Sequence, residues 1–165
     1  MRAFLLQGPW TGYRWRVPPI LLPLPNLEAT EALGARIAAS LQPGDAVLLD
    51  GPLGAGKSAL ARALLRALLR DPALHVPSPT FTLVQTYESP IGPVSHFDLW
   101  RLDGPGAVQE LGWDEARDGV VLVEWPDRLG ELRPPNALTV ALDHAGADAR
   151  AARLEGWTDR SGWAR

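Results

Sequence analysis

Residues 51–58 read Gly51-Pro52-Leu53-Gly54-Ala55-Gly56-Lys57-Ser58 and match the pattern G-x-x-x-x-G-K-[ST] in full. Glycines permit the tight turn that directs several backbone N–H groups at phosphate oxygens, and a helix beginning at Lys57 adds the positive end of its dipole. In this pattern the lysine reaches the β- and γ-phosphates, and the hydroxyl of Ser58 is a ligand for Mg²⁺. The segment therefore predicts a phosphate-binding loop for a nucleoside triphosphate.

Lys57 is the only lysine of the chain, because the other 15 of its 16 basic residues are arginines. An ammonium is a compact point charge and a guanidinium a planar fork, so a single retained lysine marks a position that needs the point charge. The same count excludes the guanine-reading motif Asn-Lys-x-Asp, which would require a second lysine. We therefore expect adenine as the base, with ATP and Mg²⁺ as the cofactors.

Apolar patterns on both sides of the loop predict alternating strands and helices. Ala46–Leu49 is a short continuous apolar run, typical of a strand covered on both faces. Amphipathic helices are predicted at Leu27–Leu41 and Lys57–Arg70, a weakly helical stretch at Val108–Arg117, and further strands at Thr80–Tyr87, Val94–Asp98, Val120–Val123, Ala137–Leu142 and Arg150–Glu155. The predicted fold class is α/β: a P-loop NTPase fold with a mostly parallel sheet flanked by helices, and an antiparallel hairpin after the P-loop helix.

Length and composition indicate one ATPase domain at residues 24–156, an N-terminal extension at 1–23 with a possible short strand at Ile20–Leu22, and a flexible tail at 157–165. No apolar run approaches the roughly 20 residues of a membrane span, and no signal peptide is recognisable, so we expect a cytoplasmic protein. The absence of cysteine excludes disulfides, a Cys-based zinc site and a catalytic thiol. A net charge of −3 disfavours direct binding to DNA or tRNA.

Two carboxylates follow predicted strands, and the carboxyl ends of parallel strands are where an α/β sheet binds its ligand. Glu124 and Asp98 are thus candidate Mg²⁺ ligands and catalytic residues, with surface acids at strand ends as the alternative. His96 faces the same side as Asp98 and either orients the site or is a core histidine. Thr80, in Ser-Pro-Thr, is a candidate sensor of the γ-phosphate, with a rigid turn as the alternative.

Other polar residues are given simpler interpretations. The arginines at positions 62, 66 and 70 are expected to form a solvated helix face, with a partner surface as the alternative. His75 and His144 are expected at the surface.

Five motifs together resemble the TsaE (YjeE) family, the small ATPases of bacterial threonylcarbamoyladenosine tRNA modification. The resemblance runs from about Leu24 to Leu154. Its carriers are Gly-Pro-Leu-Gly-Ala-Gly-Lys-Ser (51–58), Ser-Pro-Thr-Phe-Thr-Leu-Val (78–84), His-Phe-Asp-Leu-Trp-Arg-Leu (96–102), Glu-Leu-Gly-Trp (110–113) and Val-Glu-Trp-Pro (123–126). The chain departs from the family pattern at Pro52, where Asp is usual, at Ser58, where Thr is usual, and at Trp100, where Tyr is common. Residues 1–23 have no clear counterpart.

The resemblance implies a role for each matching residue. Leu53 to Ser58 would bind the phosphates, and Ser58 and Glu124 would hold Mg²⁺. Asp98 would assist at the metal or at the attacking water, and Thr80 would lie in a switch-like loop. Trp125 would lie beside the site. The segment around Leu27 would lie near the adenine.

The resemblance also implies an activity and partners. The expected function is Mg²⁺-dependent ATP hydrolysis in a complex with the TsaB–TsaD pair. That complex threonylcarbamoylates adenosine 37 of tRNAs that read ANN codons. This protein would reach the tRNA only through the complex. The alternatives are a small P-loop metabolite kinase and a nucleotide-gated binding module with negligible turnover.

Overall fold

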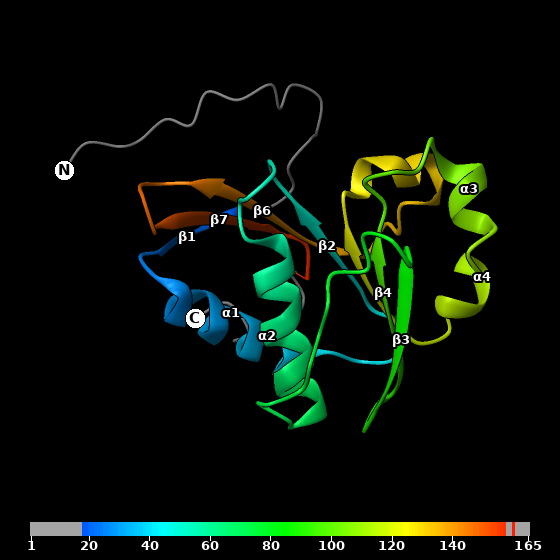
Figure 1. The fold of residues 1–165 in the computed structure, drawn as a ribbon, viewed down its shortest axis with the longest axis horizontal. Coiled ribbons are helices and arrows are strands. Elements are labelled where there is room, and N and C mark those ends of the chain that lie inside the picture. The colour runs from blue at the N-terminus through cyan, green and yellow to red at the C-terminus, as the bar shows by residue number, and fades with distance from the viewer. Residues whose placement is uncertain (1–17, 158–159, 161–165) are drawn as a thin grey trace.

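The computed structural model describes residues 18–157 and residue 160, so the first 17 residues of the predicted extension and most of the predicted tail lie outside the described residues. A seven-stranded sheet in the order β1-β7-β6-β2-β5-β4-β3 forms the centre of the structure (Figure 1). The strands are β1 (Ile20–Leu24), β2 (Ala46–Asp50), β3 (Val84–Ser89), β4 (Gly92–Asp98), β5 (Val120–Glu124), β6 (Leu138–His144) and β7 (Arg150–Glu155). The helices are α1 (Leu27–Ser40), α2 (Lys57–Leu69), α3 (Pro105–Gln109), α4 (Trp113–Ala116) and the 3₁₀ helix η1 (Pro126–Leu132).

The sheet is parallel at its centre and antiparallel toward its edges. Strand β2 pairs in parallel with β5 and β6, and β5 pairs in parallel with β4. The pairs β3–β4, β6–β7 and β1–β7 are antiparallel. The predicted hairpin after α2 is confirmed, whereas a mostly parallel sheet is only partly confirmed, because short turns join β3 to β4 and β6 to β7 and short turns permit only antiparallel pairing.

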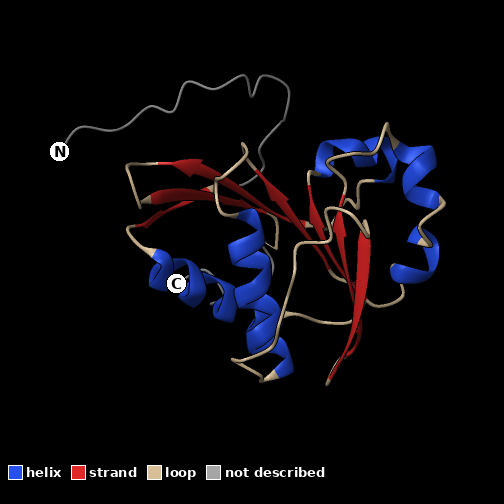
Figure 2. Ribbon diagram, viewed as in Figure 1, coloured by secondary structure: helices blue, strands red, loops and turns tan. Residues whose placement is uncertain are grey.

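Helices cover both faces of the sheet, as Figure 2 shows. Alternate residues of β2 point to opposite sides, so that Val47 and Leu49 pack with α1 and α2 while Ala46 and Leu48 pack with α3, α4 and η1. This two-sided burial explains the uninterrupted apolar run before the loop. No helix in the described part of the chain is long and apolar enough to cross a bilayer.

Helices α1 and α2 have nearly the predicted bounds. Asn26 caps α1, because its side-chain oxygen accepts a hydrogen bond of 2.9 Å from the backbone N–H of Ala29. The weakly helical stretch at 108–117 is split into α3 and α4, because Gly112 between them has φ +78°.

The strand predicted from Thr80 starts only at Val84, and residues 80–83 form a turn. In that turn Leu83 has φ +66°, and its backbone N–H donates to Pro79 O at 2.6 Å. A continuous strand from Thr80 is incompatible with this backbone.

The two ends of the described chain pack onto the sheet. Ile20–Leu24 forms β1, paired along its whole length with β7, so the sheet starts four residues before the expected domain boundary. Trp157, expected in a loose tail, is 5% exposed and packs in the core with α1 and α2, and Arg160 forms an ion pair with Asp45. Burial of an indole ring stabilises such a segment more than its terminal position suggests.

The arginine stripe of α2 is not simply solvated. Arg62 Nε donates to Val76 O at 3.4 Å, and Arg66 Nε donates to Leu74 O at 3.0 Å. These bonds hold the segment after α2 against that helix.

Gly34 sets the distance between α1 and α2, and Gly34→Ala should destabilise the protein. A Cβ at this position would lie 2.7 Å from Ala63 Cβ and 2.9 Å from Leu64 N, both on α2. Alanine favours helix by about 1 kcal/mol, but overpacking against backbone costs more, so we expect a net loss of about 1–2 kcal/mol in the free energy of unfolding. Urea denaturation measures it, and Gly106→Ala in α3, where a Cβ meets nothing within 4 Å, is the matched control. Equal stability of the two variants would contradict the close packing.

Candidate functional site

The glycine-rich loop joins the end of β2 to the start of α2, in the strand–turn–helix context that the motif requires. Gly51 has φ +133°, and a Cβ there would lie 2.2 Å from the backbone oxygen of Leu142. Gly56, which precedes α2, has φ +104°. Both positions require glycine, because each has a left-handed backbone, and Gly51 also lies too close to β6 for any side chain. The loop is thereby held against β6 and opens onto the N-terminus of α2.

The Lys57 side chain folds back beneath the loop. Its Nζ donates hydrogen bonds to Gly51 O at 2.6 Å and Pro52 O at 2.9 Å, and it lies 3.7 Å from the centroid of the Trp125 ring. The residue is only 5% exposed. Burial lowers the pKa of the Lys57 ammonium, and the nearby carboxylates of Glu124, Asp50 and Asp98 partly raise it again.

A hydrogen-bonded chain links the loop helix to β5 and β4. Ser58 Oγ donates to Glu124 Oε2 at 2.8 Å, and His96 Nε2 lies 2.9 Å from Glu124 Oε1. Glu124 and His96 are 2% and 1% exposed, so this carboxylate is buried with a partner on each oxygen. The parallel register produces the arrangement, because it aligns Leu49 of β2 with Glu124. His96 is thus a buried residue whose Nε2 contacts Glu124, while its Nδ1 is buried with no hydrogen-bond partner among the described residues.

Asp98 anchors the segment between α2 and β3. Its Oδ2 accepts hydrogen bonds from Ser78 Oγ at 3.2 Å and Thr80 Oγ1 at 2.9 Å, and its Oδ1 accepts one from the Trp100 backbone N–H at 3.1 Å. Asp98 is also the register partner of Glu124. Thr80 and Asp98 therefore lie together, one strand away from the Ser58–Glu124 pair.

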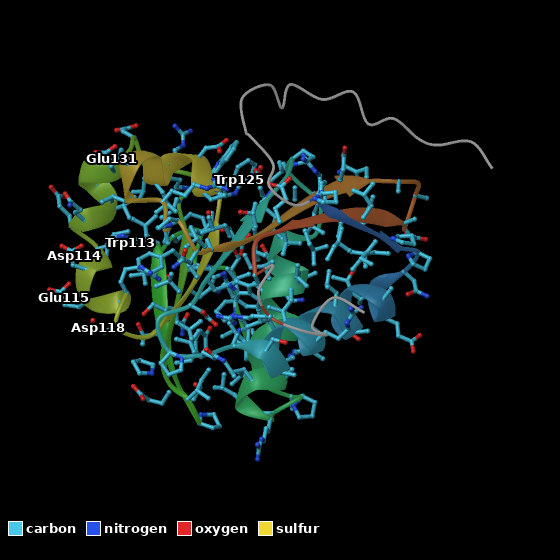
Figure 3. All side chains as sticks on the ribbon, turned by 180° about the vertical axis from the view of Figure 1, so that it is seen from behind. Trp113, Asp114, Glu115, Asp118, Trp125 and Glu131 are labelled. Carbon is cyan, nitrogen blue, oxygen red and sulfur yellow. The ribbon has the colours of Figure 1, made fainter. Side chains whose placement is uncertain are left out.

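Trp125 follows β5 directly and has φ +61°, a left-handed backbone that is rare for a large side chain and typical of functional sites. Its ring contacts Lys57, and its centroid lies 4.3 Å from that of Trp100. Figure 3 shows Trp125 between η1 and the central strands. Trp125 therefore lies beside the Lys57 ammonium, which is hydrogen-bonded to the loop.

Most of the predicted residues meet at one end of the sheet. The loop, Lys57, Ser58, Glu124 and Trp125 are connected by direct contacts. Leu27 is different: it begins α1 with 60% exposure, and no described contact joins it to Lys57 or Ser58.

Three contacts of the site were not predicted from sequence. These are the bond between His96 and Glu124, the Trp100–Trp125 ring contact, and the approach of Arg150 Nη2 to Gly54 O at 3.4 Å. The last pair is 96 positions apart and lies in no common motif. Of these three contacts, only the one made by His96 had a trace in the sequence, because its spacing of two from Asp98 places both side chains on the same side of a strand.

The fold and site define an α/β protein with one mixed seven-stranded sheet, in which a glycine-rich loop joins a central parallel strand to a helix. The family model for "Threonylcarbamoyl adenosine biosynthesis protein TsaE" matches residues 24–152. The chain belongs to the TsaE family, which confirms the resemblance stated from the motifs.

Relatives and a solved structure agree with this assignment. The tRNA threonylcarbamoyladenosine biosynthesis protein TsaE of Rickettsia felis is 39% identical over 124 residues, which cover 74% of this chain and 72% of that protein. The TsaE protein of Bacillus subtilis is 35% identical over 127 residues, covering 76% and 78%. The structure titled "Crystal structure of Bacillus subtilus YdiB" superposes with a TM-score of 0.73 at 28% identity, covering 92% of this chain and 94% of that chain.

Because Lys57 is the only lysine, the pKa of its ammonium can be followed by ¹³C NMR of lysine-labelled protein as a single Cε signal. We expect a pKa below the ordinary 10.5 in the wild type and a lower one still in Glu124→Gln, which removes the largest of the influences that raise it. Because the pKa of Lys57 is lower in the folded protein than in the unfolded chain, the unfolded chain binds more protons between the two pKa values. The free energy of unfolding should therefore increase as the pH rises from the folded-state pKa toward 10.5.

The control for this titration is Glu115→Gln, which neutralises an exposed carboxylate on α4 and should leave the Lys57 pKa unchanged. An equal pKa in Glu124→Gln and wild type would show that Glu124 does not act on the ammonium.

Proposed function

We propose that this protein is a cytoplasmic, Mg²⁺-dependent ATPase. It acts with the TsaB–TsaD pair in threonylcarbamoylation of adenosine 37 of tRNAs that read ANN codons, and its hydrolysis of ATP resets that complex between turnovers. The observation that carries the proposal is the 2.8 Å bond between Ser58 Oγ and Glu124 Oε2 at the mouth of the glycine loop. A hydroxyl and a carboxylate placed together beside a lysine and a helix N-terminus are suited to a metal-bound triphosphate.

The phosphate-binding elements are the loop amides, Lys57 and the start of α2. Lys57 now donates to two loop carbonyls and to no carboxylate among its described hydrogen bonds. Neutral carbonyls are weaker acceptors than phosphate oxygens, so the ammonium is free to exchange them for an anionic partner. Residues 51 and 53–58 are the nucleotide-binding residues of the proposal.

The donor set of the site fits Mg²⁺. Within the described residues, no group of three or more His, Asp or Glu side chains is arranged to hold a metal alone. Mg²⁺ suits such a site, because it is commonly bound by one or two protein oxygens together with phosphates and water. Ser58 and Glu124 would hold the ion, and Asp98 is the neighbour of Glu124 on the adjacent strand. The bound ion would neutralise negative charge on the phosphates.

Hydrolysis requires residues around the attacking water. Asp98 is 4% exposed and holds Ser78 and Thr80 through the same oxygen, which couples the carboxylate to the segment before β3. In the proposal Asp98 orients the water and Thr80 responds to the γ-phosphate. The sequence contains no recognisable arginine finger, so we expect slow hydrolysis by the isolated protein and stimulation by its partners.

The surface around the loop supports protein partners. Leu53, Phe81 and Trp100 are 78%, 81% and 46% exposed, and exposed apolar groups of this size mark interaction surfaces. Asp114 and Glu115 on the outer side of α4, and Asp118 just after that helix, point away from the sheet, as Figure 3 shows. Carboxylates repel phosphodiesters, so the proposal has tRNA reached through TsaB–TsaD rather than by this face.

Lys57→Ala should weaken ATP binding by about 10- to 100-fold, the cost of one charge-assisted hydrogen-bond donor. Isothermal titration with Mg-ATP measures the dissociation constant. Arg70→Ala, which removes an exposed cation from the far end of α2, is the control and should bind like the wild type. Unchanged ATP binding in Lys57→Ala would remove the phosphate-binding role from the loop.

Glu124→Ala should lower ATP hydrolysis in the presence of TsaB–TsaD by about 10²-fold or more, because a buried carboxylate that would hold the metal is lost. Metal-free ATP binding should remain, since the loop and Lys57 are intact. Glu115→Ala on exposed α4 is the matched control and should hydrolyse ATP like the wild type.

One outcome of that assay, and one of a separate phosphate-transfer assay across nucleosides and sugars, would contradict the proposal. Hydrolysis that is unchanged in Glu124→Ala while ATP still binds would show that Glu124 is not catalytic. Reproducible phosphate transfer from ATP to a nucleoside or sugar would identify a metabolite kinase instead.

A further inference from the structure

The Glu124 carboxylate is held by two donors of different kinds. Ser58 Oγ, in the first turn of α2, donates to Oε2 at 2.8 Å, and His96 Nε2, on β4, lies 2.9 Å from Oε1. The hydrogen of a hydroxyl rotates, and in the proposed function Ser58 also serves the ion. The imidazole is 1% exposed and has no such second task. The contact with His96 is therefore the fixed one of the two.

The two ring nitrogens of His96 are in different situations. Nδ1 is buried and has no hydrogen-bond partner among the described residues, whereas Nε2 faces a carboxylate oxygen. A neutral imidazole carries one N–H, and a buried N–H without an acceptor is costly. The proton therefore belongs on Nε2, where Glu124 Oε1 accepts it.

The sheet fixes the position of the imidazole relative to the carboxylate. Strands β4 and β5 pair in parallel, with His96 opposite Leu122 and Asp98 opposite Glu124. His96 therefore points to the same face of the sheet as Asp98 and lies two residues before it. Since its side chain is buried beneath the site, His96 acts on a ligand only through the groups that it holds, of which Glu124 is the one described.

A carboxylate with one oxygen occupied offers an ion the other oxygen. Oε1 of Glu124 is engaged by His96, so Oε2, which faces Ser58, is the oxygen left for an ion. Mg²⁺ takes a small and regular set of ligands and keeps several waters, whereas Ca²⁺ takes more oxygens, often both from one carboxylate. An engaged Oε1 therefore favours Mg²⁺ over Ca²⁺.

We infer that His96 is a positioning residue: its Nε2–H holds Oε1 of Glu124, so that the carboxylate presents a single oxygen and the site discriminates Mg²⁺ from Ca²⁺. The inference rests on the proposed function, in which Ser58 and Glu124 hold the ion. It adds to that function the residue that determines which ion is preferred.

The test measures ATP binding by isothermal titration in Mg²⁺, in Ca²⁺ and in EDTA. His96→Leu removes the N–H, and the ratio by which Mg-ATP is preferred to Ca-ATP should fall about 10-fold, as expected when a group that orients a metal ligand is lost. Binding in EDTA should stay within about twofold of the wild type, because the loop and Lys57 are intact. His75→Leu, at an exposed histidine beyond the end of α2, is the matched control and should keep the wild-type ratio.

His96→Gln separates the N–H from the imidazole ring, because a glutamine amide also places an N–H donor at the end of its side chain. This variant should keep the Mg²⁺ preference within about twofold of the wild type. A merely structural role would not produce rescue by this amide together with loss in His96→Leu. Thermal unfolding of each variant checks that the fold is intact.

A second measurement needs neither an ion nor a folded variant of His96. The chain has three histidines, and ¹⁵N NMR of the metal-free wild type distinguishes the tautomers of their rings. Spectra of His75→Leu and His144→Leu assign two of the signals and leave the third to His96. We expect the Nε2–H tautomer there.

The remaining outcomes separate this inference from the proposed function. A Nδ1–H tautomer at His96, an unchanged ratio in folded His96→Leu, or an equal loss in His96→Leu and His96→Gln would each overturn the inference alone. Wild-type protein that binds ATP equally well in Mg²⁺ and in EDTA would refute the metal site of the proposed function. Wild-type protein that binds no ATP would refute that function as a whole.

Discussion

The site depends on a buried ammonium that has no carboxylate among its described hydrogen-bond partners. Lys57 is held by the carbonyls of Gly51 and Pro52 and by the face of Trp125. Transferring a cation out of water is costly unless acceptors converge on it, so the loop must curl tightly enough to present two carbonyls to one nitrogen. That curl requires the left-handed backbone at Gly51 and Gly56. The loop, the lysine and the tryptophan after β5 are therefore mutually dependent.

Sheet register is the second constraint, and it acts through β5. Glu124 is opposite Leu49 of β2 and Asp98 of β4, which places its carboxylate next to Ser58 on one side and His96 on the other. A shift by one residue would turn Glu124 to the other face of the sheet and break both contacts. The four residues that precede Glu124, Val120 to Val123, are all buried in the core. Strand β5 thus contributes both to the hydrophobic core and to the position of the Glu124 carboxylate.

The parts of the site that follow from local pattern were predictable from sequence. Lys57 and Ser58 belong to one motif, and Glu124 follows an apolar run at the carboxyl end of a strand that was predicted to be parallel, so the contact of Ser58 with Glu124 across 66 positions was expected. The strand start at Thr80 was wrong, because hydrogen bonds from Ser78 and Thr80 to Asp98 hold that segment in a turn, and no local signal reports a partner 18 or 20 positions away. The antiparallel edges and the burial of Trp157 likewise depend on tertiary pairing.

The charges of the site argue for a divalent cation. One ammonium, at Lys57, lies near the buried carboxylates of Glu124 and Asp98 and the partly buried carboxylate of Asp50, so carboxylates outnumber cations here even without a nucleotide. Adding a triphosphate increases that deficit, and uncompensated charges in a low-dielectric site are too costly to persist. The dipole of α2 supplies only about half a charge. The chain as a whole has a net charge of −3, so under the proposed function the nucleotide would bring its own cation to the hydroxyl of Ser58 and the carboxylate of Glu124.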